Sequence, residues 1–185
     1  MLLVNRKTVT RVSALILVLM LVLSSTACLA ASFTKSAAGV KYNGKTVKLG
    51  ATTSKETLVK VFGSGCRTAK VAVCGIMPYG GRVYKFASKG ISIDTRYKNA
   101  KKTSEQVVTI TLTKSTVPTL AGLKVGDTTS KLSQKYGKKC YVDYGNKNHV
   151  YYESGDYVMD VFTRSTKNSS GKKVNTITKL VFLIY

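Results

Sequence analysis

The chain contains nearly the same short passage twice. The stretch "LGATTSKETLVKVFGSGC" at 49–66 and the stretch "VGDTTSKLSQKYGKKC" at 125–140 share a glycine, the run TTSK, a leucine, an aromatic residue followed by glycine, and a cysteine, once a two-residue gap is allowed. Chance rarely produces so many identities in so few positions. A duplicated segment is the economical explanation, and it restricts the fold to one built from two similar units.

Each copy begins with a short predicted helix. Thr53 or Ser54 can cap the run "KETLVKVF", whose apolar residues recur at spacings that place them on one side of a helix. Gly63 in the first copy and Gly137 in the second follow the apolar run. Because glycine readily adopts positive φ, both helices are predicted to end at these glycines.

The residues after each helix alternate between apolar and polar side chains. "YKFASKGISIDT" at 84–95 aligns with "VYYESGDYVMDV" at 150–161, which brings Asp94 onto Asp160. Alternation with a period of two is typical of strands with one buried face. The predicted fold class is therefore α+β, with two tandem repeats side by side, each a short helical segment packed on a roughly four-stranded antiparallel sheet.

Domain organisation follows from this pattern. A unit of roughly 65 residues buries too little apolar surface to be stable alone, so the two copies are expected to share a core. The final run "LVFLIY" is apolar on both faces and is placed near the junction of the halves. The predicted divisions are a signal peptide at 1–31, repeat 1 at 32–113, a linker at 114–122 and repeat 2 at 123–185.

The N-terminal segment has the three parts of a secretory signal. Arg6, Lys7 and Arg11 precede the apolar block "VSALILVLMLVL". Small residues in "SSTACLAA" then offer cleavage near 27–31. The block is shorter than the roughly 18 residues of a spanning helix, although a retained membrane anchor is the alternative. "STAC" resembles the lipobox of bacterial lipoproteins, so Cys28 is a candidate for lipid attachment, and plain secretion is the other outcome.

The chain is strongly basic. It has 30 Lys and Arg residues against 8 Asp and Glu residues, and removing the three basic residues of the predicted leader leaves 27 against 8, a formal charge of +19. A field of that size attracts anionic partners. For an exported protein these are the membrane surface and phosphate-rich wall polymers rather than nucleic acid, although the lysines could also serve only as a soluble exterior.

The repeated motif resembles a known family. Its order of glycine, threonine, leucine, aromatic residue, glycine and cysteine, followed twice by an antiparallel sheet, is similar to the beta-lactamase inhibitory protein family. It also resembles small outer-membrane assembly lipoproteins with a helix-on-sheet unit and tandem-repeat lipoproteins of Gram-positive gut anaerobes. The resemblance covers about residues 45–185 and implies a concave face made by two four-stranded sheets, with proteins as ligands. The basic charge departs from the family, and no contact loop of the inhibitors is matched.

In that family each half carries a disulfide. The first half of this chain offers Cys66 and Cys74, whose pairing would tie the helix exit to the first strand. Cys140 has no second cysteine in its half. A bridge between Cys74 and Cys140, or three reduced thiols, are the alternatives.

The chain offers little for catalysis. His149, the one histidine, is expected in a hairpin as a surface residue without a role. No cluster of His, Cys, Asp and Glu has the spacing of a metal site, and the acidic residues stand singly. The run "GSG" at 63–65 lacks the rest of a phosphate-binding loop. An enzyme is therefore not expected, and neither is a cofactor or a metal.

Tyrosine is the prominent aromatic residue, with eleven copies and no tryptophan. It supplies rigid amphipathic contact area at interfaces, although half-buried tyrosines are ordinary in sheets. Lysines in two basic turns are expected to project from the same end of both repeats as a clamp for anions. The predicted binding residues are Tyr84, Tyr97, Lys98, Lys101, Lys102, Tyr152, Tyr157, Lys167, Lys172 and Lys173.

These features together predict an exported, non-enzymatic binding protein of the bacterial cell surface, lipid-anchored or secreted. It is expected to recognise another protein through the concave sheet. The alternative is an electrostatic adhesin for an anionic cell-wall polymer or membrane surface. No nucleic-acid partner is expected.

Overall fold

The computed structural model describes residues 32–75 and 77–185, and Ser32–Tyr185 form one compact unit of the predicted α+β class. The predicted signal peptide and Cys28 lie outside the described residues. None of the helices in the described part is long and apolar enough to cross a bilayer. The elements are η1 (Lys35–Ala37), β1 (Gly39–Tyr42), β2 (Lys45–Lys48), β3 (Thr52–Thr53), α2 (Lys55–Phe62), β4 (Arg67–Val71), β5 (Gly81–Phe86), η2 (Ala87–Lys89), β6 (Ile91–Tyr97), β7 (Glu105–Leu112), α3 (Thr129–Tyr136), β8 (Tyr141–Asp143), β9 (Asn146–Ser154), β10 (Tyr157–Lys167) and β11 (Lys173–Ile184).

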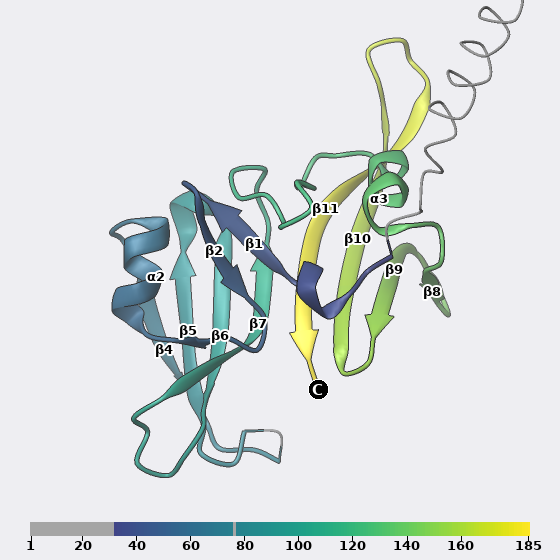
Figure 1. The fold of residues 1–185 in the computed structure, drawn as a ribbon. Coiled ribbons are helices and arrows are strands. Elements are labelled where there is room, and N and C mark those ends of the chain that lie inside the picture. The colour runs from purple at the N-terminus through teal and green to yellow at the C-terminus, as the bar shows by residue number, and fades with distance from the viewer. Residues whose placement is uncertain (1–31, 76) are drawn as a thin grey trace, which may run out of the picture. The chain divides into compact units, whose positions relative to one another are not determined.

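One continuous antiparallel sheet runs through the unit (Figure 1). Its strands lie in the order β4-β5-β6-β7-β11-β10-β9-β8, and β3 pairs with β7. The last strand of each half lies at the centre, where Leu112 of β7 faces Leu180 of β11 and Ile110 faces Phe182. The final apolar run is at the junction, as predicted. The halves are joined into one sheet rather than two, because these two strands complete each other's backbone hydrogen bonds.

Both helices begin and end at residues that the sequence marks. Ser54 caps α2 and Thr128 caps α3, and each side chain accepts a hydrogen bond from the backbone N–H three residues later. Gly63 and Gly137 end the helices at φ values of 90° and 85°, as predicted. The buried residues are Leu58, Val61 and Phe62 in α2, and Leu132 and Tyr136 in α3.

The run TTSK occupies different places at the two helix starts. The cap of α2 is Ser54, the third residue of the first run, whereas the cap of α3 is Thr128, the first residue of the second run. The contacts just before the helices nonetheless match, because Gly50 N and Gly126 N each donate a hydrogen bond of 2.8 Å to the last strand of their own half. The two-residue gap in the alignment therefore lies between this contact and the helix cap.

The third and fourth strands after each helix, which are β6 and β7 in the first half and β10 and β11 in the second, share an irregularity. The register shifts between Asp94 and Thr95 in β6, opposite β7, and between Phe162 and Thr163 in β10, opposite β11. Counted from these bulges, Asp94 corresponds to Phe162, so the predicted equivalence of Asp94 and Asp160 is wrong. The cause is that the β9–β10 hairpin is two residues longer than the β5–β6 hairpin, which an ungapped alignment ignores.

The last residue of each helix is aromatic, and its ring packs on an aromatic ring of the second strand after the helix, β5 or β9. The ring centroids of Phe62 and Phe86 are 5.2 Å apart, and those of Tyr136 and Tyr152 are 6.2 Å apart. The β1–β2 hairpin covers the same face, since the Tyr42 ring lies 5.9 Å from Phe62 and the hairpin crosses in front of the sheet in Figure 1. We call this covered face the inner face and the opposite one the outer face.

Two further segments cross between the halves. Val117 and Thr119, in the predicted linker, are buried with exposed fractions of 0% and 1%, and Thr119 forms a bridge with Val40 of β1. Phe33, assigned from the sequence to the first repeat, stacks instead on Phe182 of β11 at 6.3 Å. The predicted linker is thus part of the core, and Phe33, near the start of the described residues, covers the second half.

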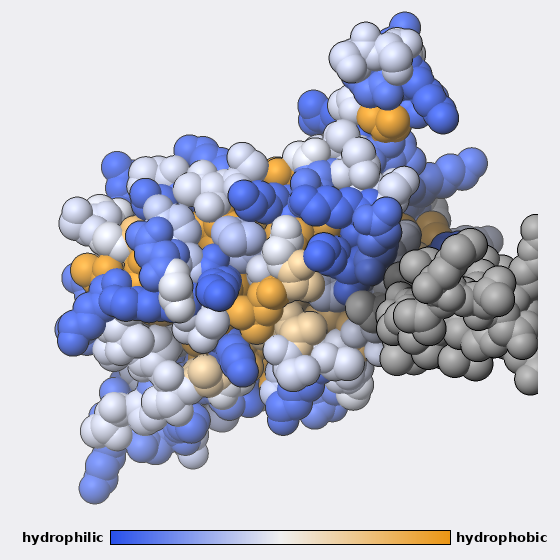
Figure 2. All heavy atoms as spheres, turned by 45° about the horizontal axis from the view of Figure 1, so that its top comes forward, coloured by the Kyte–Doolittle hydropathy of each residue, from blue (hydrophilic) through white to orange (hydrophobic). Residues whose placement is uncertain are grey.

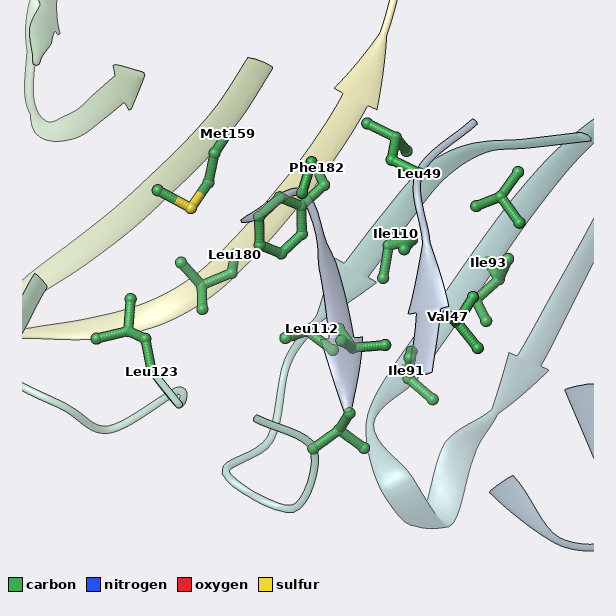
Figure 3. Close-up of a cluster of buried hydrophobic side chains, with 14 of the residues drawn as sticks. Val47, Leu49, Ile91, Ile93, Ile110, Leu112, Leu123, Met159, Leu180 and Phe182 are labelled. Carbon is green, nitrogen blue, oxygen red and sulfur yellow. The ribbon is translucent and has the colours of Figure 1, made fainter. Parts of the chain in front are cut away.

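A single cluster of buried apolar side chains spans the junction (Figure 3). Ile110 and Leu112 of β7 lie beside Leu180 and Phe182 of β11, and all four are fully buried. Each such side chain contributes roughly 1.5–3 kcal/mol when it is removed from water. The halves therefore share one core, as the size of each half led us to expect.

The first half also buries a carboxylate. Glu105, 7% exposed, accepts hydrogen bonds from Tyr84 Oη at 2.8 Å and Thr95 Oγ1 at 2.7 Å. The guanidinium of Arg82 lies 3.5 Å from the same carboxylate. Burial raises the pKa of Tyr84 to about 12, so this hydroxyl remains a donor. A buried charge is tolerated only with such partners, which makes Glu105 a structural centre of the first half.

We expect Glu105→Ala to lower the free energy of unfolding by about 2–4 kcal/mol, because Tyr84 and Thr95 lose their buried acceptor and Arg82 loses its counter-ion. Urea denaturation followed by circular dichroism measures this change. Asn175 occupies the matching position of β11 and is exposed, so Asn175→Ala should change the same quantity by no more than about 0.5 kcal/mol. Equal effects of the two substitutions would contradict this account of Glu105.

Candidate functional site

Four rings form a row across the outer face of the second half. Tyr141 of β8 stacks on Tyr151 of β9 with centroids 5.1 Å apart, and Tyr151 lies 6.3 Å from His149. His149 in turn stacks on Phe162 of β10 at 4.4 Å, with the ring planes 3° from parallel. We call these four residues the aromatic row.

The row follows directly from strand register. Tyr141 faces Tyr151 in the β8–β9 ladder, and His149 faces Phe162 in the β9–β10 ladder. Side chains directly opposite each other on one face of an antiparallel pair are close enough to touch. Tyr141, at 57% exposed, is the most accessible ring of the row. The row therefore presents a continuous aromatic surface that begins at the sheet edge.

A cation extends the row onto β11. Lys179 faces Phe162 in the β10–β11 ladder, and its Nζ lies 4.1 Å from the centroid of that ring. Phe162 thus has neighbours on both flanking strands, the imidazole of His149 and the ammonium of Lys179. A cation over an aromatic face is stabilised by the negative charge of the π system.

Two carboxylates hold His149 in place. Nδ1 lies 3.0 Å from Asp143 Oδ2 and Nε2 lies 3.0 Å from Asp160 Oδ1. A neutral imidazole can donate through one nitrogen only, whereas an imidazolium can donate through both. Burial lowers the pKa of His149, but the hydrogen bonds to Asp143 and Asp160 outweigh burial, and the net shift is upward. The arrangement therefore favours the charged ring and links β8, β9 and β10.

His149 lies in a hairpin, as expected, because β9 pairs with its sequence neighbours β8 and β10. The expectation of a surface residue is wrong, since the side chain is only 17% exposed. The alternation in 146–154 does place His149 and Tyr151 on one face. Asp143 and Asp160 are six residues before and eleven after His149, and only the pairing of the strands brings them together.

The four tyrosines predicted to bind a partner lie inside the fold. Tyr84, Tyr97, Tyr152 and Tyr157 have exposed fractions of 0%, 8%, 2% and 8%. Their hydroxyls or rings contact neighbouring parts of the core, as when Tyr152 Oη donates to Gly137 O at 3.1 Å. These side chains are therefore not available as a binding surface, because alternation places them on the buried face of their strands.

The six predicted lysines are exposed, but they do not form one clamp. Lys98, Lys101 and Lys102 lie in the turn between β6 and β7, which we call the basic turn. Lys167, Lys172 and Lys173 lie around the β10–β11 turn. Because β7 and β11 are antiparallel, these two turns are at opposite ends of the sheet (Figure 1). The expected clamp would require them at the same end.

The predicted disulfide between Cys66 and Cys74 is not present. Cys66, Cys74 and Cys140 are all free. The extended strand β4 separates Cys66 from Cys74, and five extended residues span roughly 16 Å. The Cα atoms of a disulfide lie within about 7 Å of each other, so this separation excludes the bridge.

The first half has no counterpart of the aromatic row. Matching by strand register and by the bulges assigns one residue of β4, β5 or β6 to each position of the row. In the order Tyr141, Tyr151, His149 and Phe162, the matching residues are Arg67, Lys85, Val83 and Asp94. The first half therefore forms the same strand pairing without rings at these positions.

The side chains that could bind a metal ion do not come together in the described residues. Across 32–75 and 77–185, no group of three or more His, Cys, Asp and Glu side chains is arranged to hold a metal ion. His149 has both ring nitrogens engaged by carboxylates. In this arrangement both ring nitrogens are within hydrogen-bond distance of a carboxylate, and neither faces open solvent as a lone acceptor.

We expect the free energy of unfolding to fall as the pH rises through the neutral range. Because the pKa of His149 is raised in the folded state, its charge stabilises the fold below the unfolded value of about 6.5, and this contribution is lost as the pH rises through the folded pKa. Urea midpoints across this range measure the slope. His149→Gln should flatten it, because the chain has one histidine. Asp94→Asn, on the outer face of the first half, should keep the wild-type slope, and an unchanged slope in His149→Gln would refute the assignment.

Alkylation without a reductant should modify Cys66, Cys74 and Cys140. Cys74 should react first, because its side chain is exposed whereas the other two are partly buried. Peptide mass spectrometry at several reaction times gives the three rates. Recovery of a peptide linking Cys66 to Cys74 would contradict the structure.

The chain has few recognisable relatives among the proteins compared with it. No protein-family model matches the chain, and no curated protein matches it. Among solved structures, the chain is similar to the uncharacterized protein YfeY from Escherichia coli, with a TM-score of 0.45, 14% sequence identity, and coverage of 83% of this chain and 99% of that chain. A similarity of this size does not assign the site.

Proposed function

We propose that this chain is an exported, non-enzymatic binding protein that recognises another protein through the aromatic row. The observation that carries the proposal is the row itself, two stacked pairs of rings joined by the tilted contact of Tyr151 with His149, on the face of the sheet opposite α2 and α3. Aromatic side chains are enriched at the centres of protein interfaces, because they offer large contact areas and lose little rotamer freedom.

The edge next to the row favours a protein partner. Tyr144 is fully exposed, and Val142 of β8 is 60% exposed. Among the described residues, β8 is the last strand at its side of the sheet, so its outer edge can pair with an added strand. A partner that lies along this edge can contact Tyr141 and Tyr151 with its side chains while it extends the sheet.

The contrast between the halves also supports a role in recognition. The four register-matched positions of the first half hold two basic side chains, one aliphatic side chain and one acidic side chain in place of rings, yet its strands pair in the same way. The exposed rings Tyr141 and Tyr151, at positions where the first half has Arg67 and Lys85, are better explained by an interaction. The engagement of both nitrogens of His149 supports a binding role over a catalytic one.

The two halves are further proposed to be tandem repeats produced by duplication. Support comes from the shared order of one helix and four strands, the matching bulges and the matching contact before each helix. The resemblance to the beta-lactamase inhibitory protein family, whose best-known members bind proteins, agrees with this proposal. Export and lipid attachment at Cys28 rest on the leader sequence alone.

Photo-crosslinking in the producing cells tests the proposed interface. A photoreactive phenylalanine analogue replaces Tyr141 or Tyr151 in one set of proteins, and Arg67 or Lys85, the register-matched residues, in the control set. Discrete protein adducts are expected from the first set only. The same adducts should form when irradiation is carried out in about 1 M salt, where charges are screened over about 3 Å. Equal adducts from both sets would refute the proposal.

One observation favours a second function, adhesion to an anionic wall polymer. From Val161 to the C-terminus the chain has no acidic residue. The end of the β10–β11 hairpin, with Arg164, Lys167, Lys172 and Lys173 exposed, stands clear of the surrounding surface in Figure 2. Retention on purified cell wall that disappears at about 1 M salt, without protein adducts from the row, would favour this function.

A further inference from the structure

Apolar side chains are exposed at one end of the first half, in the loop between β4 and β5. Val73 is 66% exposed and Tyr79 is 39% exposed, and Cys74 and Pro78 are exposed beside them. We call these four residues the apolar tip. Monomeric proteins seldom place several apolar residues together on a projecting loop unless these residues contact something.

The backbone of the tip is hydrogen-bonded to itself. Cys74 N donates to Met77 O at 3.1 Å, and Met77 N donates to Cys74 O at 2.9 Å. Gly80 N also donates to Met77 O at 2.9 Å. These bonds matter because a backbone group that enters an apolar medium without a partner costs several kcal/mol.

The basic turn lies at the same end of the sheet as the apolar tip. Tyr97 N donates to Gly80 O at 2.9 Å, and Gly81 faces Arg96 in the β5–β6 ladder. The β4–β5 loop and the β6–β7 turn therefore leave the sheet together (Figure 1). Between Glu56 and Glu105 the chain has a single acidic residue. Exposed lysines thus flank the apolar tip with little opposing charge.

We propose that this end of the first half docks on an anionic lipid bilayer, with the apolar tip in the headgroup region and the basic turn against lipid phosphates. Apolar side chains flanked by lysines match the two layers of a bilayer surface, the acyl boundary and the charged headgroups. A hydrophilic wall polymer would leave Val73 and Tyr79 without an apolar environment. A single loop also offers less area than a stable protein interface needs.

Docking at this end is independent of the aromatic row. The tip leaves the sheet beside β4, and the row begins at β8, and these are the two outermost strands of the sheet. A protein held on a membrane by the tip would therefore keep the row uncovered. The inference adds a membrane surface to the proposed protein partner and does not rest on that partner.

Flotation with lipid vesicles tests the inference. Every form consists of the compact unit Ser32–Tyr185, so that neither the apolar leader nor a lipid at Cys28 contributes. The vesicles are phosphatidylcholine alone or phosphatidylcholine mixed with phosphatidylglycerol. The parent should bind the mixed vesicles more tightly, and Val73→Ser with Tyr79→Ser should weaken this binding by about tenfold or more.

The matched control removes two exposed apolar side chains at the opposite edge. Val142→Ser with Tyr144→Ser should bind the mixed vesicles as the parent does. Lys98→Gln with Lys101→Gln should weaken binding and reduce its dependence on salt. The inference is overturned if the tip variant binds like the parent, if the control weakens equally, or if the parent binds both kinds of vesicle alike.

A second measurement leaves the apolar side chains unchanged. A polarity-sensitive fluorophore on Cys74, in a form that carries Cys66→Ser and Cys140→Ser, should shift its emission to shorter wavelength with mixed vesicles and not with phosphatidylcholine alone. An emission unchanged by mixed vesicles would contradict insertion. The tip variant should retain the photo-crosslinks from Tyr151, so the membrane inference and the protein-binding proposal can fail separately.

Discussion

The pairing of β7 with β11 is the interaction on which the rest of the structure depends. Without it, each of these apolar strands would be a sheet edge with unpaired backbone groups, and Ile110 and Phe182 would face water. With it, the two halves form one sheet over one core. Phe33 and residues 114–122 then cover that core across the junction, and neither half is enclosed by its own residues alone.

Antiparallel pairing at the centre also determines where the surface features of the two halves lie. It sends the outer strands β4 and β8 to opposite edges and the equivalent turns of the halves to opposite ends. The outer strands and the basic turns, which occur once in each half, are therefore far from their counterparts. The aromatic row and the apolar tip are each present in one half only, and each lies at its own edge of the sheet.

The sequence allowed the local features of the fold to be predicted, and the long-range ones only in part. Ser54, Gly63 and Gly137 act on their own neighbours, so the helix ends could be predicted correctly. The alternation of Tyr84 with Phe86 already indicated that Tyr84 lies on a buried face. It was predicted to bind a partner only because the chain is rich in tyrosine. The site around His149 could not be predicted, because it depends on the register of three strands and no local pattern encodes that register.

The position of the β7–β11 ladder has a mechanical consequence. The apolar tip and the basic turn leave one end of the sheet, and the β10–β11 turn leaves the other (Figure 1). A pull applied between these two ends would run along the strands, so the central ladder would be loaded in shear and its hydrogen bonds would have to break together. Tension along this axis would therefore meet more resistance than tension that separates the strands one bond at a time.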